Sequence, residues 1–496
     1  MNLHNFDWHK PNVLLINFGL EALGVRQLAS FLKKSSCKVN ILFLHHGIDD
    51  KQANLLANFI DYNNYNVVGF SCMTGDYYEI KLLSQFIKLS KNRPLIIWGG
   101  VHPTILPEEC LFEGGADLVF NAAAEIPLAK LLTGSPLIEV PNIAWIDHEE
   151  LITNYTDVTL YPPDSMPFPD FEFNDHFVIK DNKIVSLDTK IFRERYPWKG
   201  THYYGITARG CPYHCAYCCN IYHGKFLRKS VDYFMEELSY IGKKLPFFST
   251  LSIQDDSLFM NEIRWINDFS EKYKRKINKP LRAALMPKFG TNERLKPLAE
   301  AGLTYIGIGL QGSSRLNKEI YGRKESSESF LQAVYNYKKL GIVGRIDVIV
   351  DNPYEQEDDL LEIANTLNEI PKPFAISVFT LTLFRGTKMT TMAERDGMAH
   401  LFAGDPYVPG LDAGKYTEGK YRTPEHYKTL FKDYLPNLPR KYCKYLISNI
   451  KRMDTQQQII RYSRWPQKVR KIGTKLREMS PRLFDRTILY FNKRLR

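Results

Sequence analysis

The chain has 496 residues, of which 44% are hydrophobic and 24% are charged. This composition excludes an intrinsically disordered or fibrous protein, and the length predicts two to four domains. The net charge of +11 is concentrated after residue 450, where fourteen Lys and Arg residues stand against three Asp and Glu residues, so the rest of the chain is near neutral and does not indicate nucleic-acid binding.

The N-terminus has no basic segment followed by an apolar one, and the apolar runs stay well short of the roughly 18 residues that a membrane span needs. We therefore expect a cytoplasmic protein with no secretory signal, in which thiols stay reduced.

Residues 1–134 predict a doubly wound, Rossmann-like domain. Continuous apolar runs at 13–19, 38–44, 67–74, 94–100 and 116–123 alternate with amphipathic helical segments such as 24–35 and 77–90. Such an alternation is typical of a parallel sheet that is covered by helices on both faces. Ligands of these folds bind where the strands end, so Ser71, Thr74, Gly99 and Gly100 are expected at one crevice.

Residues 135–200 have little periodicity. They include the Pro-rich stretch "YPPDSMPFPDFEF", in which each proline biases the preceding residue away from helix. We expect this segment to be a linker between domains.

Residues 201–395 predict a partial, TIM-like (β/α)6 barrel. Six strand candidates lie at 202–208, 251–255, 281–286, 305–311, 344–350 and 374–380, with helical segments near 230–243, 261–275, 291–301, 326–339 and 356–369 between them. Catalytic residues of such barrels collect at the C-terminal ends of the strands. From residue 396 to residue 496 the pattern is mainly helical.

Four of the eight cysteines lie in the stretch "RGCPYHCAYCC", directly after the first barrel strand. A disulfide knot does not suit a reducing compartment. A zinc site usually has a fourth ligand from a second CxxC or HxxxH pair, and here only His214 or His223 could supply one. The x3/x2 spacing of Cys211, Cys215 and Cys218 instead favours a 4Fe-4S cluster with one iron left open.

This loop resembles the radical S-adenosylmethionine (SAM) superfamily, whose motif is CxxxCxΦC with an aromatic residue at Φ. Tyr217 stands at that place and, by this resemblance, would line the SAM site. The resemblance implies that Cys211, Cys215 and Cys218 bind the cluster and that SAM is cleaved reductively to a 5′-deoxyadenosyl radical. Cys219 is not expected to be a ligand, because adjacent residues cannot easily reach one cluster face; a half-buried thiol is the plainer interpretation.

The same resemblance implies SAM contacts at the strand ends. Gln254 and Asp255, in "LSIQDDSLF", would lie near the SAM amino group, whereas Asp256 and Ser257 suit a helix cap equally well. Gln311 would face the methionine or ribose. Arg345 would pair with the SAM carboxylate; a surface salt bridge is the alternative.

The stretch "GGVHPTILPE" resembles the cobalamin (B12)-binding-domain subclass of the superfamily, which includes the class B methyltransferases. It implies cobalamin at the crevice of Ser71, Thr74, Gly99 and Gly100. The Asp-x-His-x-x-Gly motif that supplies a cobalt ligand in many cobalamin proteins is absent, so cobalamin without a histidine ligand is expected, and His102 is interpreted as structural. Of the Gly-Glu-Gly-Glu that relatives commonly show, only Glu125 is kept.

Three functions stay open at this point. The first is a radical SAM enzyme that methylates an unactivated carbon with cobalamin. The second is a cobalamin-free radical SAM enzyme that performs C–C or C–S bond formation, cyclisation or rearrangement on a natural-product or lipid substrate. The third is a binding module stabilised by a cluster or zinc, without turnover.

The expected partners are a small-molecule or lipid substrate and an external electron donor such as flavodoxin or ferredoxin. The basic C-terminal tail interleaves Lys and Arg with Trp465, Val469, Ile472 and further apolar residues. This pattern is typical of an amphipathic helix, which either makes peripheral membrane contact or packs on the barrel.

Overall fold

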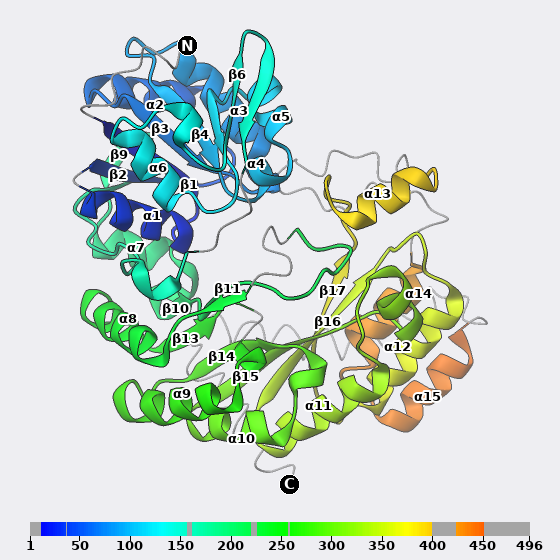
Figure 1. Cartoon of the computed structure of the whole chain (residues 1–496). Coiled ribbons are helices and arrows are strands. Elements are labelled where there is room, and N and C mark those ends of the chain that lie inside the picture. Colours follow the sequence, from blue (N-terminus) through cyan, green and yellow to red (C-terminus); the bar gives the residue numbers. More distant parts are fainter. Residues whose placement is uncertain are drawn as a thin grey trace.

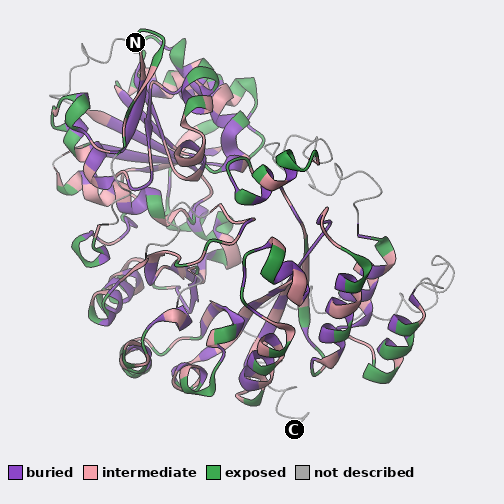
Figure 2. Ribbon diagram, turned by 45° about the vertical axis from the view of Figure 1, so that its right-hand side comes forward, coloured by how far each residue is buried: buried purple, intermediate pink, exposed green. Residues whose placement is uncertain are grey.

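The computed structural model describes residues 11–35, 37–155, 161–219, 226–255, 258–398 and 423–450. Two α/β parts lie one above the other in Figure 1, the first in blue and cyan and the second in green and yellow. Each has a buried sheet, and the exposed residues gather on the helices around it (Figure 2).

The first part is a doubly wound sheet, as the sequence predicts. Its central strands run parallel in the order β5-β4-β3-β1-β2. They are β1 Asn12–Phe18, β2 Lys38–Leu44, β3 Val67–Ser71, β4 Leu95–Gly99 and β5 Leu118–Phe120. The intervening helices are α1 Leu23–Lys34, α2 Asp50–Tyr62, α3 Tyr77–Lys88, α4 Val101–Ile105, α5 Pro107–Glu109 and α6 Glu125–Leu132.

The two faces of this sheet have separate apolar cores. Leu15 and Ile97 pack in the core that includes residues of α1 and α6, while Leu14 and Ile96 pack in the core of α2 and α3. Because side chains alternate along a strand, a fully apolar run fills both cores at once. This explains why the sequence pattern identifies these strands.

The prediction that residues 135–200 form a linker is wrong. This segment adds strands to both edges of the first sheet. β6 Ile143–Asp147 and β7 Glu150–Asn154 form an antiparallel hairpin beside β5, and β8 His176–Lys180 and β9 Lys183–Ser186 form another beside β2. These strands have four or five residues, and β7 and β9 bury none of them, so edge hairpins leave little periodic signal. Helix α7, Thr189–Arg195, follows.

The second part is a six-stranded parallel sheet in the order β10-β13-β14-β15-β16-β17. The strands are β10 His202–Gly205, β13 Thr250–Ile253, β14 Leu281–Leu285, β15 Leu303–Gln311, β16 Val343–Val350 and β17 Ala375–Thr380. Helices α8 Val231–Lys244, α9 Ile263–Lys276, α10 Asn292–Glu300, α11 Ser327–Lys339 and α12 Glu357–Glu369 lie outside the curved sheet (Figure 1). The expected partial barrel is confirmed.

The C-terminal region is helical where the structure describes it, with α13 Lys388–Arg395, α14 Glu425–Thr429 and α15 Arg440–Ser448. Residues 423–450 contact the barrel at Asp351, the residue that follows β16. The carboxylate of Asp351 accepts hydrogen bonds from the Thr423 amide at 2.9 Å and from Lys428 Nζ. In the described part of the chain, no helix is long and apolar enough to cross a membrane. The basic tail, 451–496, lies outside the described residues.

Candidate active site

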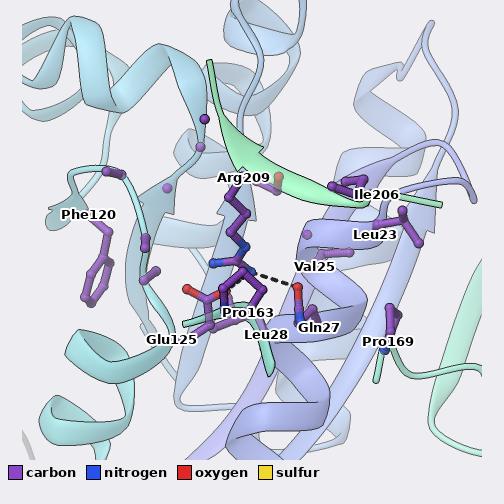
Figure 3. Close-up of a pocket in the computed structure, with 18 of the residues that line it drawn as sticks. Leu23, Val25, Gln27, Leu28, Phe120, Glu125, Pro163, Pro169, Ile206 and Arg209 are labelled. Atoms are coloured by element: carbon purple, nitrogen blue, oxygen red, sulfur yellow. Dashed lines mark hydrogen bonds and ion pairs between the residues drawn. The ribbon is translucent and has the colours of Figure 1, made fainter. Parts of the chain in front are cut away.

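A cavity of about 490 Å³ lies between the two domains. Leu15, Gly69 and Ile97 line it from the first sheet, and helices α1 and α6 flank it. From the barrel side come Ile206, Arg209, Cys211, Gln254 and Asp255. The segment before β8 adds Pro163 and Pro169, which Figure 3 labels together with Ile206 and Arg209. The first cysteine of the motif and the strand ends of the first domain therefore line one cavity.

Two glycines bring the backbone of the first domain close to this cavity. A Cβ on Gly69 would lie 2.9 Å from Leu15 Cδ2 and 3.2 Å from Ile97 Cγ1. Gly100 has a φ of +105°, and a Cβ there would lie 2.9 Å from the Cys72 carbonyl oxygen. A side chain at position 69 would crowd Leu15 and Ile97, which line the cavity, so Gly69 keeps space there. Gly100 instead allows its own backbone to pack against that of Cys72.

Three of the four crevice residues expected from the sequence line the cavity, namely Ser71, Gly99 and Gly100. Thr74 is not among the lining residues; it begins a 3₁₀ turn, Thr74–Asp76, and is buried. The turn redirects the chain after β3, so Thr74 packs inward although it is only three residues from Ser71.

The His-Pro-Thr stretch after Gly100 packs the fold. His102 is 1% exposed, its ring centroid lies 4.8 Å from that of Tyr77, and burial lowers its pKa to about 4. Thr104 Oγ1 accepts a hydrogen bond from the Ala122 amide at 2.8 Å, which holds the loop after β5 at the cavity. Among the described residues that line the cavity there is no histidine. The interpretation of His102 as structural agrees with these contacts.

The cysteine loop is carried by a short antiparallel ribbon above the barrel. Strand β11, Ala208–Gly210, pairs with β12, Phe226–Arg228, and the four cysteines follow β11. The amide of Cys218 donates to the Cys215 carbonyl at 3.0 Å, which closes a tight turn around Ala216 and Tyr217. All four thiols are half-buried.

The turn inside the loop is anchored to the barrel. The Ala216 amide donates to the Tyr321 carbonyl at 2.9 Å, and the Ala216 carbonyl accepts from the Met389 amide at 2.9 Å. The ring of Tyr217 meets that of Tyr321 edge-on, with centroids 5.0 Å apart, and its hydroxyl accepts from Arg323 Nη1 at 3.1 Å. Because Ala216 and Tyr217 are anchored in this way, the backbone of Cys215 and Cys218, which flank them, is held in place against the barrel.

In the described residues, no three Cys, His, Asp or Glu side chains converge closely enough to hold a metal ion. Burial raises the pKa of Cys215 and raises that of Cys219 to about 11. The donor set itself, three half-buried thiols that lie close together in the sequence on an anchored turn, fits a cluster with three protein ligands.

Two expected SAM contacts lie at the end of β13. The side chain of Gln254 is exposed at the cavity, and its backbone amide donates a hydrogen bond to the Gly205 carbonyl at 2.9 Å. The carboxylate of Asp255 accepts from the Thr207 hydroxyl at 2.9 Å and from the Thr207 amide. Asp255 thus ties β13 to the chain that leads into the cysteine loop. Asp256 and Ser257 lie outside the described residues.

Gln311 ends β15 with a φ of +62°. Its side chain turns back over Gly309, where a Cβ would lie 2.3 Å from Gln311 Nε2. Gly309 therefore makes room for this amide on the inner face of the sheet, which is a reason for a glycine in the middle of a strand.

Arg345 lies in the barrel interior and is paired with a residue that the sequence interpretation missed. Its Nε and Nη2 donate to the two carboxylate oxygens of Asp347 at 2.8 and 3.1 Å. Gly344 and Ile346, which alternate with them, are buried on the opposite face. Burial raises the pKa of Asp347, and the ion pair with Arg345 opposes that rise. This pair could have been predicted from the sequence, because residues i and i+2 of a strand lie on the same face and Arg345 and Asp347 carry opposite charges.

Comparisons with known proteins agree with this architecture. Residues 206–367 match the family model of the radical SAM superfamily, and residues 10–132 match that of the B12 binding domain. An uncharacterized methyltransferase of Pyrococcus horikoshii is 21% identical over 348 residues, which are 68% of this chain and 71% of that protein.

Two solved structures share the fold over most of the chain. The cobalamin-dependent SAM radical enzyme OxsB, with aqua-cobalamin bound, superposes with a TM-score of 0.67 at 19% identity, over 97% of this chain and 72% of OxsB. The radical SAM methyltransferase TsrM from Kitasatospora setae, with tryptophan and a SAM analogue bound, gives a TM-score of 0.61 at 15% identity, over 77% and 76% of the two chains.

Proposed function

We propose that this chain, which belongs to the radical SAM superfamily and carries a B12 binding domain, is an enzyme that methylates an unactivated carbon of a small molecule. Its domains imply three cofactors: a 4Fe-4S cluster, SAM and cobalamin. The observation that carries the proposal is the shared cavity, because Cys211 lines it together with Gly69, Gly99 and Gly100.

In this proposal the bound cofactors supply one-electron reduction of SAM, hydrogen abstraction and methyl transfer, and the protein supplies position and shelter. Cys211, Cys215 and Cys218 hold the cluster. Their loop stays in place through Ala216 and Tyr217, whose contacts to Tyr321 and Arg323 fix the turn between the ligands.

The inner face of the barrel binds SAM. Arg345 offers a guanidinium whose Nη1 lies outside its pair with Asp347, and so it can meet a carboxylate through a charge-assisted hydrogen bond. Gln311 presents an amide from the end of the neighbouring strand. Asp347 keeps Arg345 from swinging away, because both its oxygens are engaged.

The cavity wall of the first domain binds cobalamin. Gly69 has no side chain to fill this wall, and the lining is mainly apolar, with the polar side chain of Ser71 among it. A mostly apolar hollow with a few polar groups is the usual character of a cofactor site. Since the described lining contains no histidine, the cobalt would receive no imidazole from these residues.

The proposal is tested with anaerobically reconstituted protein. Dithionite should drive conversion of SAM to 5′-deoxyadenosine, and Cys215→Ala should abolish it. An external reductant such as flavodoxin should replace dithionite. SAM cleavage by protein that binds no corrinoid would favour a cobalamin-free rearrangement or bond-forming reaction, and no cleavage at all would contradict the enzymatic proposal.

A further inference from the structure

A buried ion pair joins the two domains two residues before the first cysteine. Arg209 lies in β11, and its Nη2 donates to Glu125 Oε1 at 2.5 Å and to Gln27 Oε1 at 2.7 Å. The side chains of Arg209 and Glu125 are 18% and 7% exposed. Figure 3 shows the guanidinium pointing from β11 toward Glu125 and Gln27, with Pro163 beside it.

The two acceptors come from the two helices that flank the cavity. Gln27 lies in α1, and Glu125 is the first residue of α6, where a negative charge also interacts favourably with the helix dipole. One guanidinium therefore ties α1 and α6 to the strand that enters the cysteine loop. Both hydrogen bonds leave the same nitrogen, Nη2. The side chain of lysine is one bond shorter, so its ammonium would not reach both acceptors from the same backbone position.

The ribbon that carries the loop needs such a tie. Its strands β11 and β12 have three residues each and pair with one another outside the six-stranded sheet. From the barrel side it is held by Asp255 through Thr207. From the first domain, Arg209 holds it.

A second ion pair between the domains offers a comparison. Arg385, after β17, donates from Nη1 to Glu109 Oε2 of α5 at 3.0 Å, and the Arg385 side chain is 55% exposed. Neither residue lines the cavity. Solvent screens an exposed pair, so it contributes little to geometry, whereas a buried pair with a third partner is held firmly.

We propose that the bridge of Arg209, Glu125 and Gln27 positions the cluster loop relative to the B12 binding domain and so sets the separation and orientation of the two metal centres. The inference rests on the proposed function, since it requires both centres to be bound. Arg209 and Glu125 act here as positioning residues, through the ribbon and helix α6. A purely structural ion pair would affect stability but leave the mutual geometry of the bound cofactors unchanged.

The test uses holoprotein loaded with the cluster and cobalamin, both in paramagnetic reduced states. Electron paramagnetic resonance then measures the magnetic coupling between the reduced cluster and cobalt(II), which depends steeply on their separation. Iron and corrinoid contents and thermal melting are recorded for each sample. The variants are Glu125→Gln, which removes the charge and keeps the shape, and Arg209→Lys, which keeps the charge on a shorter side chain; Glu109→Gln is the matched control.

We expect the coupling to be weakened or lost in Glu125→Gln and in Arg209→Lys, at wild-type cofactor content, and to be unchanged in Glu109→Gln. Wild-type coupling in both fully loaded variants would overturn the positioning role. Loss of corrinoid from both variants would also overturn it, by assigning the bridge to cofactor binding. A wild-type protein that holds a cluster and no corrinoid would contradict the proposed function itself. The corrinoid content of the wild type reveals this case before any variant is compared.

Discussion

Replacing Gly69 by alanine tests the cobalamin cavity with the smallest possible change. The added Cβ would lie 2.9 Å from Leu15 Cδ2 and 3.2 Å from Ile97 Cγ1, whereas carbon atoms pack at about 3.5–4.0 Å. Both side chains line the cavity, so they can yield only by moving roughly half an ångström or more into it. The fold keeps its shape while the binding space shrinks.

The magnitudes separate binding from stability. Overpacking destabilises a protein by about 1–3 kcal/mol. The lower end of this range applies because Leu15 and Ile97 have room to move. Alanine also restricts the unfolded chain more than glycine does, which stabilises the folded state by about 0.4–1 kcal/mol. We therefore expect the free energy of unfolding to change by no more than about 1 kcal/mol. The ligand, by contrast, must repack against two displaced side chains, and a penalty of about 1.4–2.8 kcal/mol weakens binding roughly 10- to 100-fold.

Titration of hydroxocobalamin, followed by its visible spectrum, measures the corrinoid Kd of Gly69→Ala beside thermal melting. Gly75→Ala is the control, because nothing lies within 4 Å of its added Cβ and Gly75 does not line the cavity. Corrinoid affinity equal to that of the wild type in Gly69→Ala would refute the placement of cobalamin in this cavity.

Three further predictions follow from the site and from the end of β16. Cys215→Ala should lose the iron of reconstituted protein, whereas Cys219→Ala should retain it; iron loss in Cys219→Ala would show that the ligand set is wrong. Arg345→Lys should raise the KM for SAM about tenfold, measured by 5′-deoxyadenosine formation, because a lysine cannot serve Asp347 and a carboxylate together and a hydrogen bond to a charged group contributes about 1.5–3 kcal/mol; an unchanged KM would remove Arg345 from the SAM site. Burial raises the pKa of Glu355 to about 8 from 4.5, so the folded state binds this proton more tightly than the unfolded state does. The contribution of Glu355 to stability should then be greatest below about pH 4.5 and fall by up to about 1.4 kcal/mol per pH unit as pH rises toward 8. In denaturant unfolding at pH 5.5 and 7.5, Glu355→Gln should remove this contribution from the pH dependence of the free energy of unfolding, and an identical pH dependence in both proteins would contradict this effect of burial.

The five central strands of the first sheet are predictable from the sequence because burial on both faces produces a continuous apolar run. In β1, for example, every residue from Val13 to Asn17 is buried. The elements of the barrel are predictable because short apolar strands alternate with amphipathic helices. The cysteine motif is visible in the sequence because Cys211, Cys215 and Cys218 lie within one loop and their spacing is local; that they bind a cluster stays a prediction.

Contacts between distant segments were not predictable in this way. The edge hairpins formed by β6–β7 and by β8–β9 expose part of their surface, so no period marks them. Strand β8 also pairs with β2, which lies far earlier in the chain. The bridge from Arg209 to Glu125 spans 84 residues and joins two domains. Thr74 illustrates a third limit, because a single 3₁₀ turn after β3 directs it away from the cavity that Ser71 lines.

The most direct test of the central claim is the metal and corrinoid content of anaerobically purified protein supplied with iron, sulfide and hydroxocobalamin. We expect about four irons, as a 4Fe-4S cluster, together with one corrinoid per chain, which is seen in the visible spectrum and recovered by extraction. Protein that carries the full cluster and cleaves SAM, yet binds no corrinoid, would contradict the claim that both cofactors meet at the cavity between the two domains.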